Sequence, residues 1–196
     1  MAEKIFRQSR DALRMLAPGP LALVTTMYRD QPNVMTAAWM QPISLSPMLI
    51  SVAVQPSRLT HEFMTKTEVF TINFPTLESL NAVYLAGMVS GRDRDKFEAS
   101  GLTPEPGVAT EAPLIAECVA HIECNVRDRV SIGDHDLFVT IPMRVTALEE
   151  AFNGVWLTES DAGKVLHHLG GDRFSARGKK LSGARCRNLK TSNRPN

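Results

Sequence analysis

The chain has 196 residues, of which 43% are hydrophobic and 22% charged, so it is long and apolar enough to form one globular domain with its own core. Eight of the 22 Lys and Arg residues lie from Arg173 onward, where no Asp or Glu occurs, which leaves 14 basic and 21 acidic residues in residues 1–172. Nucleic-acid surfaces usually combine a basic face with aromatic residues, and this basic end contains only Phe174. We therefore expect no nucleic-acid partner, and we expect residues 176–196 to be a flexible basic tail.

Membrane and secretion signals are not visible in the sequence. No apolar run approaches the roughly 20 residues that a membrane-spanning helix needs, and the first 16 residues lack the apolar core of a signal peptide. The three cysteines, Cys118, Cys124 and Cys186, form no metal-binding motif. If Cys118 and Cys124 share one strand, they lie about 20 Å apart at roughly 3.3 Å per residue and cannot form a disulfide. These features predict a cytoplasmic protein with no membrane partner.

The first part of the chain predicts a lead-in and a hairpin. Residues 1–17 are expected to be an N-terminal lead-in with one helical turn at 11–16, and residues 18–175 to form the domain. An apolar, β-branched strand is predicted at 21–27, followed by a turn with Asp30 at its tip and a second strand at 33–39. Small residues in that second strand would either let a flat ligand approach the backbone or pack against another element. Residues 41–47 contain two prolines and two serines, so a loop is expected there.

A third apolar strand at 48–54 leads directly into a short helix at 58–65. Ser57 is the expected N-cap of this helix, and Thr60 its N3 residue. Backbone N–H groups, two hydroxyls and the Arg58 guanidinium would then surround one helix N-terminus, which favours the binding of an anion. The alternative is a plain helix cap without a ligand.

The rest of the chain predicts more strands than helices. Strands are expected at 68–73, 114–127, 136–148, 154–157 and 164–168, and helices at 77–86 and 93–100. Residues 114–127 alternate in polarity, which places Glu123 on a half-exposed face, and Pro142 indicates an edge or a bulge in the following strand. The fold class that follows is mainly β, a small β-barrel with helical covers.

Catalytic side-chain motifs are absent. The chain contains no G-x-S-x-G, H-E-x-x-H, Walker or G-x-G-x-x-G motif, and its five histidines have no metal-ligand spacing. We therefore expect neither acid–base catalytic residues nor metal ligands. The reactivity would have to come from a bound group.

Five stretches, NVMTAAW at 33–39, PSRLTH at 56–61, TINF at 71–74, SGRDRDKF at 90–97 and IGDH at 132–135, occur in a characteristic order. From about Pro18 to Phe174 the chain resembles the flavin reductase-like FMN-binding split-barrel family, and the flavoredoxin group in particular. The resemblance implies a Greek-key-like split barrel that forms a homodimer and holds FMN, less commonly FAD, near the subunit interface.

The same resemblance implies a set of cofactor-binding residues. Ser57, Arg58 and Thr60 would hold the phosphate, with Lys96 as an added cation for the phosphate or the ring. Trp39 would line the ring, although a place in the core or in a dimer interface is equally consistent with its type. The remaining residues implied for the isoalloxazine and ribityl parts are Asn33, Met35, Thr36, Ala37, Ser51, Val52, Asn73, Phe74, His135 and Phe174.

The implied function is an FMN-binding oxidoreductase that passes electrons from NAD(P)H, a transient substrate, to a second acceptor. That acceptor would be free flavin or a redox protein. Two alternatives remain open at this point. One is a flavin-holding electron carrier without NAD(P)H oxidase activity, and the other is a split-barrel binding module that has lost flavin.

Overall fold

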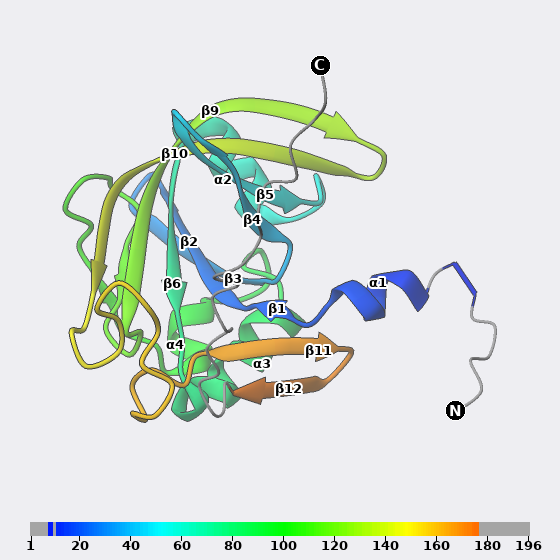
Figure 1. Ribbon diagram of the computed structural model, residues 1–196. Helices are drawn as coiled ribbons and strands as arrows, with labels where there is room; N and C mark the ends of the chain where they lie inside the picture. Colours follow the sequence, from blue (N-terminus) through cyan, green and yellow to red (C-terminus); the bar gives the residue numbers. More distant parts are fainter. Residues whose placement is uncertain (1–7, 10, 177–196) are drawn as a thin grey trace, which may run out of the picture.

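A seven-stranded antiparallel sheet with the order β3-β2-β6-β9-β10-β5-β4 dominates the computed structural model, which describes residues 8–9 and 11–176 (Figure 1). The two end strands of this sheet, β3 and β4, follow one another in the chain, so the sheet curls and the short connection through Trp39 joins its two edges. The carbonyl of Trp39 accepts a hydrogen bond from Ala53 N of β5 at 2.9 Å. The mainly β, split-barrel prediction is confirmed. The strands are β2 Ala22–Tyr28, β3 Gln31–Ala37, β4 Met40–Leu45, β5 Met48–Val54, β6 Val69–Phe74, β9 Ala120–Ile132 and β10 His135–Ala147.

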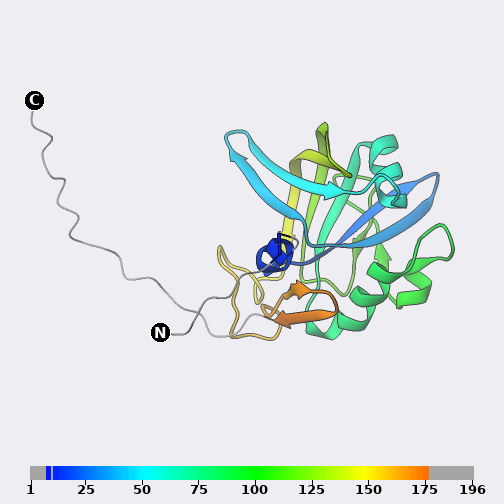
Figure 2. The same cartoon turned by 90° about the vertical axis from the view of Figure 1, so that its right-hand side faces the viewer.

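Short helices and two small sheets cover the barrel (Figures 1 and 2). Helix α2 contacts β2 and β3, and α3 and α4 contact β3 and each other. The helices are α1 Asp11–Leu16, α2 Leu59–Thr67, the 3₁₀ turn η1 Leu77–Ser79, α3 Leu80–Met88 and α4 Lys96–Ser100. One small sheet contains β1 Gly19–Pro20, β11 Leu166–Gly170 and β12 Arg173–Ala176, and the other pairs β7 Pro104–Glu105 with β8 Leu114–Ile115.

Strand β2 is buried on both faces from Ala22 to Thr26, which agrees with its mostly apolar and β-branched sequence. Ala22 and Val24 point into the barrel interior, which also contains Phe70 and Phe138. Leu23 points the other way, into a second cluster that includes side chains of α3 and α4. The β2–β3 hairpin turns at Arg29 and Asp30, whose φ angles are 52° and 60°. The predicted turn at Asp30 is therefore confirmed, with the left-handed pair that two-residue hairpins favour.

The predicted loop at 41–47 is wrong, because Met40–Leu45 forms β4. Strand β4 is an edge strand, where a proline does not remove a hydrogen bond that a second neighbour needs. The pairing with β5 shifts register between Pro42 and Ser44, which is how the strand accommodates the proline. A similar shift between Pro142 and Arg144 in β10 confirms the predicted bulge.

Other boundaries differ from the prediction. The expected strand at 114–127 is divided into β8 and β9, the expected strand at 154–157 is only an isolated bridge between Phe152 and Trp156, and the helix expected at 93–100 begins at Lys96. Asp95 caps that helix by accepting hydrogen bonds from Phe97 N and Glu98 N. The expected tail at 176–196 lies outside the described residues except for Ala176.

Cys118 and Cys124 are buried and unpaired, and Cys118 lies before β9 rather than on the strand that contains Cys124. Burial raises the pKa of both thiols, that of Cys124 to about 12, so neither is a thiolate near neutral pH. Cys186 lies outside the described residues. Within the described part of the chain, no helix is both long and apolar enough to span a bilayer.

Glu123 is buried, with 1% of its surface exposed, although its strand pattern predicted a half-exposed face. Its Oε2 accepts hydrogen bonds from three consecutive backbone N–H groups, Val108, Ala109 and Thr110, at 2.9, 2.7 and 2.9 Å. The loop at 106–113 folds over this face of β9, and the carboxylate satisfies the loop's amides. The polarity pattern could not show this because the covering loop is distant in sequence.

We predict that Glu123→Ala lowers the free energy of unfolding by about 3 kcal/mol, because three buried amides lose a charged acceptor. Urea denaturation followed by circular dichroism measures the change. Glu149→Ala, at an exposed position, is the matched control and should change stability by less than about 0.5 kcal/mol. Equal effects of the two substitutions would contradict this role for Glu123.

Candidate functional site

A cavity of about 430 Å³ lies between β3, the end of β5, the start of α2 and the end of α3. This volume is within the range of small-molecule sites. The structure brings together most of the residues proposed from the sequence here, from elements far apart in the chain. The cavity is lined by Asn33, Met35, Thr36, Ala37, Ala38, Trp39, Ala53, Val54, Gln55, Ser57, Arg58, Leu59, Thr60, Ala86, Gly87, Val89, Ser90, Gly91, Lys96, His135 and His168.

The charges in the cavity are of one sign. Arg58 and Lys96 line it together with His135 and His168, and no Asp or Glu is among the described lining residues. The body of the chain is acidic, so this local excess of cations is not a consequence of composition. Two cations without a counter-ion favour an anionic ligand.

Lys96 is held inside the cavity wall with 7% of its surface exposed. Its Nζ donates hydrogen bonds to the carbonyls of Val34 at 2.8 Å and Ala86 at 2.7 Å, which ties β3 to α3. An ammonium has three N–H donors, so one remains after these two bonds. Desolvation, followed by the charge of Arg58, lowers the pKa of Lys96 to about 8.

The N-terminus of α2 faces the same cavity without a side-chain cap. The helix begins at Leu59, with Arg58 as its N-cap in an extended conformation and with no capping hydrogen bond. Ser57 is therefore not the N-cap, and Thr60 is the second helical residue rather than the third. The reason is a turn before the helix, closed by Arg58 N donating to Gln55 O at 3.0 Å, with Pro56 at the position that prolines favour. Amides of the first helical turn have no partner within the helix and can bind an anion.

Asn33 joins the two walls of the cavity. Its Nδ2 donates to Thr60 Oγ1 at 2.8 Å, and both side chains are 2% exposed. Its Oδ1 is buried and has no hydrogen-bond partner among the described residues. Because buried acceptors are nearly always satisfied, this oxygen indicates a missing donor such as a ligand hydroxyl.

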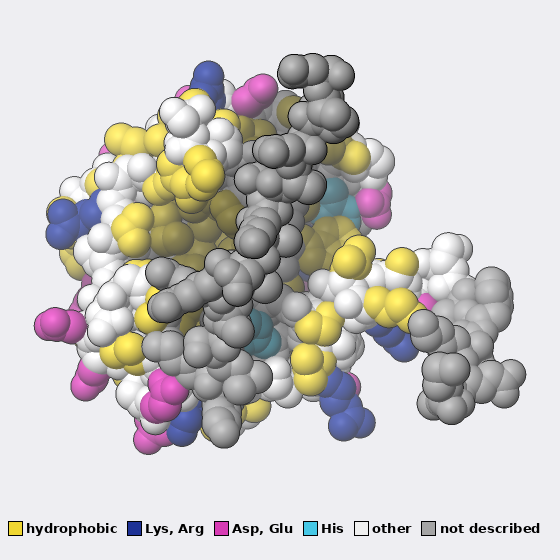
Figure 3. Space-filling view, viewed as in Figure 1, with side chains coloured by type: hydrophobic (Ala, Val, Ile, Leu, Met, Phe, Trp, Pro, Cys, Tyr) yellow, Lys and Arg dark blue, Asp and Glu magenta, His cyan; other side chains and the backbone are white. Residues whose placement is uncertain are grey.

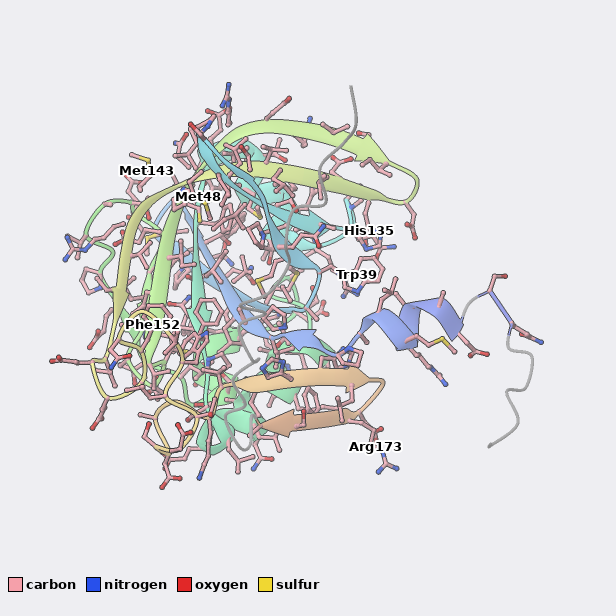
Figure 4. The ribbon with its side chains drawn as sticks, in the orientation of Figure 1. Trp39, Met48, His135, Met143, Phe152 and Arg173 are labelled. Carbon is pink, nitrogen blue, oxygen red and sulfur yellow. The ribbon has the colours of Figure 1, made fainter. Side chains whose placement is uncertain are left out.

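Part of the cavity lining is aromatic. The rings of Trp39 and His135 lie with their centroids 4.8 Å apart, and Figure 4 shows the two side chains adjacent to each other. His135 Nδ1 is 2.8 Å from Asp134 Oδ1. Trp39 is 46% exposed, so it is a wall of the cavity and of the surface rather than a core residue. A flat ring system could pack against this part of the lining.

Five of the proposed residues do not reach the cavity. Asn73 is fully buried, and its amide is used by Leu23 O, Thr25 Oγ1 and Ile115 N inside the fold. Ser51 and Val52 are buried in the middle of β5, one to two residues before the part of the strand that lines the cavity. Phe74 packs on Trp156, and Phe174 packs on Tyr84 and His168.

The sequence reasoning missed several lining residues. His168 is not among the residues proposed from the sequence, but β11 places it at the cavity, with its Nε2 3.0 Å from Gly171 O. Gly91 lies within the SGRDRDKF stretch and lies against Asn33. A glycine at this position was the sequence signal for a close backbone contact, because a Cβ at Gly91 would lie 2.3 Å from Asn33 Oδ1 and 2.9 Å from Leu59 Cδ2.

Comparison with known proteins places this cavity in a family context. Residues 14–163 match the sequence model of the flavin reductase-like domain. The chain belongs to the flavin reductase-like family. Among curated relatives of this family, an uncharacterised protein of Pyrococcus abyssi is 38% identical over 144 residues, 74% of this chain and 83% of the relative. The uncharacterised protein YddH of Escherichia coli is 31% identical over 176 residues, 87% and 93% of the two chains.

Solved structures have the same fold. Flavoredoxin of Desulfovibrio vulgaris is 28% identical with a TM-score of 0.80, over 95% of this chain and 99% of that one. An FMN-binding protein from Thermus thermophilus, solved with bound 1-cyclohex-2-enone, has a TM-score of 0.80 at 23% identity, over 94% and 100% of the two chains. The family match and these neighbours together associate the chain with flavin-related redox proteins.

We predict that Gly91→Ala destabilises the protein by about 1–3 kcal/mol, because the new Cβ overlaps Asn33 and Leu59. Thermal unfolding measures the effect. Gly87→Ala is the matched control, since its Cβ would meet Thr36 at an ordinary 3.4 Å and alanine favours the helix. A Gly91→Ala protein as stable as the Gly87→Ala protein would show that Asn33 is not packed as described.

Proposed function

We propose that the cavity binds FMN and that the protein is an oxidoreductase, which passes electrons from NAD(P)H by way of the flavin to a second acceptor. The observation that carries the proposal is that the cavity lining combines two kinds of group. One kind is cationic, with Arg58, Lys96 and an uncapped helix N-terminus, and the other is aromatic, with Trp39 and His135. FMN combines two matching groups, a dianionic phosphate and a flat ring system.

The residues present fit this group. Ser57, Arg58, Thr60 and the first amides of α2 would hold the phosphate, with Lys96 as a further cation. Asn33 Oδ1 would accept a hydrogen bond from a ribityl hydroxyl, which would satisfy its unpaired lone pairs. FMN would supply the electron-transfer chemistry when bound, while the protein binds and orients it and tunes its potential.

FMN is proposed rather than FAD because of what the structural neighbours are named to bind. The neighbour from Thermus thermophilus is named as an FMN-binding protein, which agrees with this choice. An absorbance spectrum of the purified protein, with mass analysis of any released ligand, distinguishes FMN from FAD. A colourless protein that gains no flavin absorbance after FMN is added would instead support the flavin-free binding module.

A second candidate is a flavin-holding electron carrier that does not oxidise NAD(P)H. The flavoredoxin of Desulfovibrio vulgaris, which matches almost end to end at 28% identity, favours it. Anaerobic titration of the FMN-loaded protein with NADH and NADPH separates the two candidates. The oxidoreductase proposal requires bleaching of the flavin band within minutes. A flavin that stays oxidised with both nucleotides, but is reduced by dithionite, would support the electron carrier and contradict the NAD(P)H oxidoreductase.

We also propose that the protein acts as a homodimer. Helix α1 has no buried residue, and Leu16 and Leu45 are 83% and 88% exposed. A mainly apolar hollow of about 540 Å³, which includes Leu16, Trp39 and Leu137 in its lining, adjoins the flavin cavity. Figure 3 shows hydrophobic side chains along α1 and around a hollow on the same face. Exposed apolar surface of this kind, beside a half-built site, is typical of an interface between subunits.

For the dimer, Leu16→Glu combined with Leu45→Glu should convert the protein to a monomer, because two charges would be buried in the interface. Sedimentation velocity at tens of micromolar measures the mass. Arg173→Glu, at an exposed position, is the control and should leave the dimer intact. A wild-type protein that sediments as a monomer would refute the proposal.

For the phosphate, Ser57→Ala combined with Thr60→Ala should weaken FMN binding by about 3–6 kcal/mol, since two hydrogen bonds to a charged group are lost. Isothermal titration calorimetry measures both affinities. Riboflavin lacks the phosphate, so its binding should change much less than that of FMN. An unchanged FMN affinity would place the phosphate elsewhere.

For Lys96, FMN affinity should fall as the pH rises above about 8. The free protein loses the Lys96 proton near pH 8, whereas a bound phosphate would raise the pKa again, so binding takes up a proton in that range. Above pH 8 the FMN dissociation constant should therefore increase with pH, by no more than about tenfold per pH unit. Fluorescence titrations between pH 7 and 9 test this. Lys96→Met should bind more weakly with a flat profile, and a flat wild-type profile would contradict the assignment.

A further inference from the structure

His61 and Asp136 form a buried pair behind the cavity, and neither residue lines it. They are 9% and 7% exposed, and His61 Nε2 lies 2.8 Å from Asp136 Oδ2. His61 is in the first turn of α2, and Asp136 is the second residue of β10. The rings of His61 and Phe138 make an edge-to-face contact, with centroids 5.2 Å apart and planes at 74°. The imidazole is therefore packed as well as hydrogen-bonded.

Each member of the pair follows a cavity residue in the chain. His61 follows Thr60, and Asp136 follows His135, which packs on Trp39. The pair thus connects the backbone of α2 to the backbone of β10 directly beside two lining residues of the cavity. The connection spans 75 positions of sequence.

Asp136 is itself anchored within the barrel. It pairs with Val54 of β5 and with Ser131 of β9 in the sheet, and Arg129 Nε lies 3.6 Å from the same carboxylate oxygen. Hydrogen bonds from His61 and then Ser131 lower the pKa of Asp136, which keeps the carboxylate charged. Arg129 also donates to Thr65 Oγ1 on α2 at 2.9 Å. A second contact therefore joins α2 to β9.

We propose that His61 and Asp136 are positioning residues, which hold the N-terminus of α2 at the correct place for the phosphate group of the ligand. The proposal rests on the proposed function of the cavity in binding FMN. A buried pair of this kind adds little net stability, because desolvation offsets the attraction, but it restricts the geometry of the elements it joins. Binding groups that are already in place lose less entropy when the ligand arrives.

The test compares FMN with riboflavin in His61→Leu, which removes the donor but keeps an apolar side chain. We expect the FMN dissociation constant to rise at least tenfold and that of riboflavin to change less than threefold, because riboflavin has no phosphate to lose contact with. His61→Gln, whose amide can still donate to Asp136, should bind FMN within threefold of wild type. Lys66→Gln, in an exposed ion pair on the same helix, is the matched control and should leave both affinities unchanged.

Hydrogen–deuterium exchange of the ligand-free proteins gives a second readout that does not depend on flavin. In His61→Leu the amides of residues 59–62 should exchange faster, while those of β2 and β6 stay as in wild type. If His61→Leu does not fold, Asp136→Asn replaces it with the same expectations. Equal losses for FMN and riboflavin, unchanged FMN affinity, or unchanged exchange at 59–62 would overturn the proposal. A wild-type protein that does not bind FMN would refute the proposed function, while the exchange result would still decide whether the pair positions α2.

Discussion

The hydrogen bond between Asn33 and Thr60 is the contact on which the cavity depends. It holds strand β3 against the start of α2, and its burial makes the contact costly to break. The residues assigned to the phosphate are placed relative to this bond, because Ser57 and Arg58 lie three and two residues before Thr60 and Lys96 is bonded to the carbonyl of Val34, the neighbour of Asn33. Small residues, Ala37 and Gly91 among them, keep the space beside it open.

The electrostatics of the site are unfavourable in the free protein. Lys96 is desolvated close to Arg58, and the cavity offers neither of them a carboxylate. A protein that bound nothing here would gain stability from an apolar or acidic replacement. Such unpaired, desolvated cations are common where residues serve ligand binding rather than stability. Here an anionic ligand would supply the missing negative charge.

Local features were predictable from the sequence, and those that depend on distant packing were not. The hairpin at Asp30 could be predicted because of its turn residues, and the buried strand before it because of its apolar and β-branched residues. Arg58 and Lys96 could be predicted as site residues because they lie in the PSRLTH and SGRDRDKF stretches. Asn73 looked like a site residue because it lies near the end of a strand, but backbone groups of Leu23 and Ile115, from two other segments, use its amide. Glu123 looked exposed because its covering loop is remote in sequence, and the position of His168 at the cavity depends on the pairing of β1 with β11.

The central claim is that the N-terminus of α2 binds the phosphate of FMN. A crystal structure of the protein grown with FMN tests it most directly. Phosphate oxygens should lie within hydrogen-bond distance of Thr60 Oγ1 and the first amides of α2, and the flavin ring should lie beside Trp39 and His135. A flavin whose phosphate lies away from α2, or a cavity without flavin at saturating FMN, would contradict it.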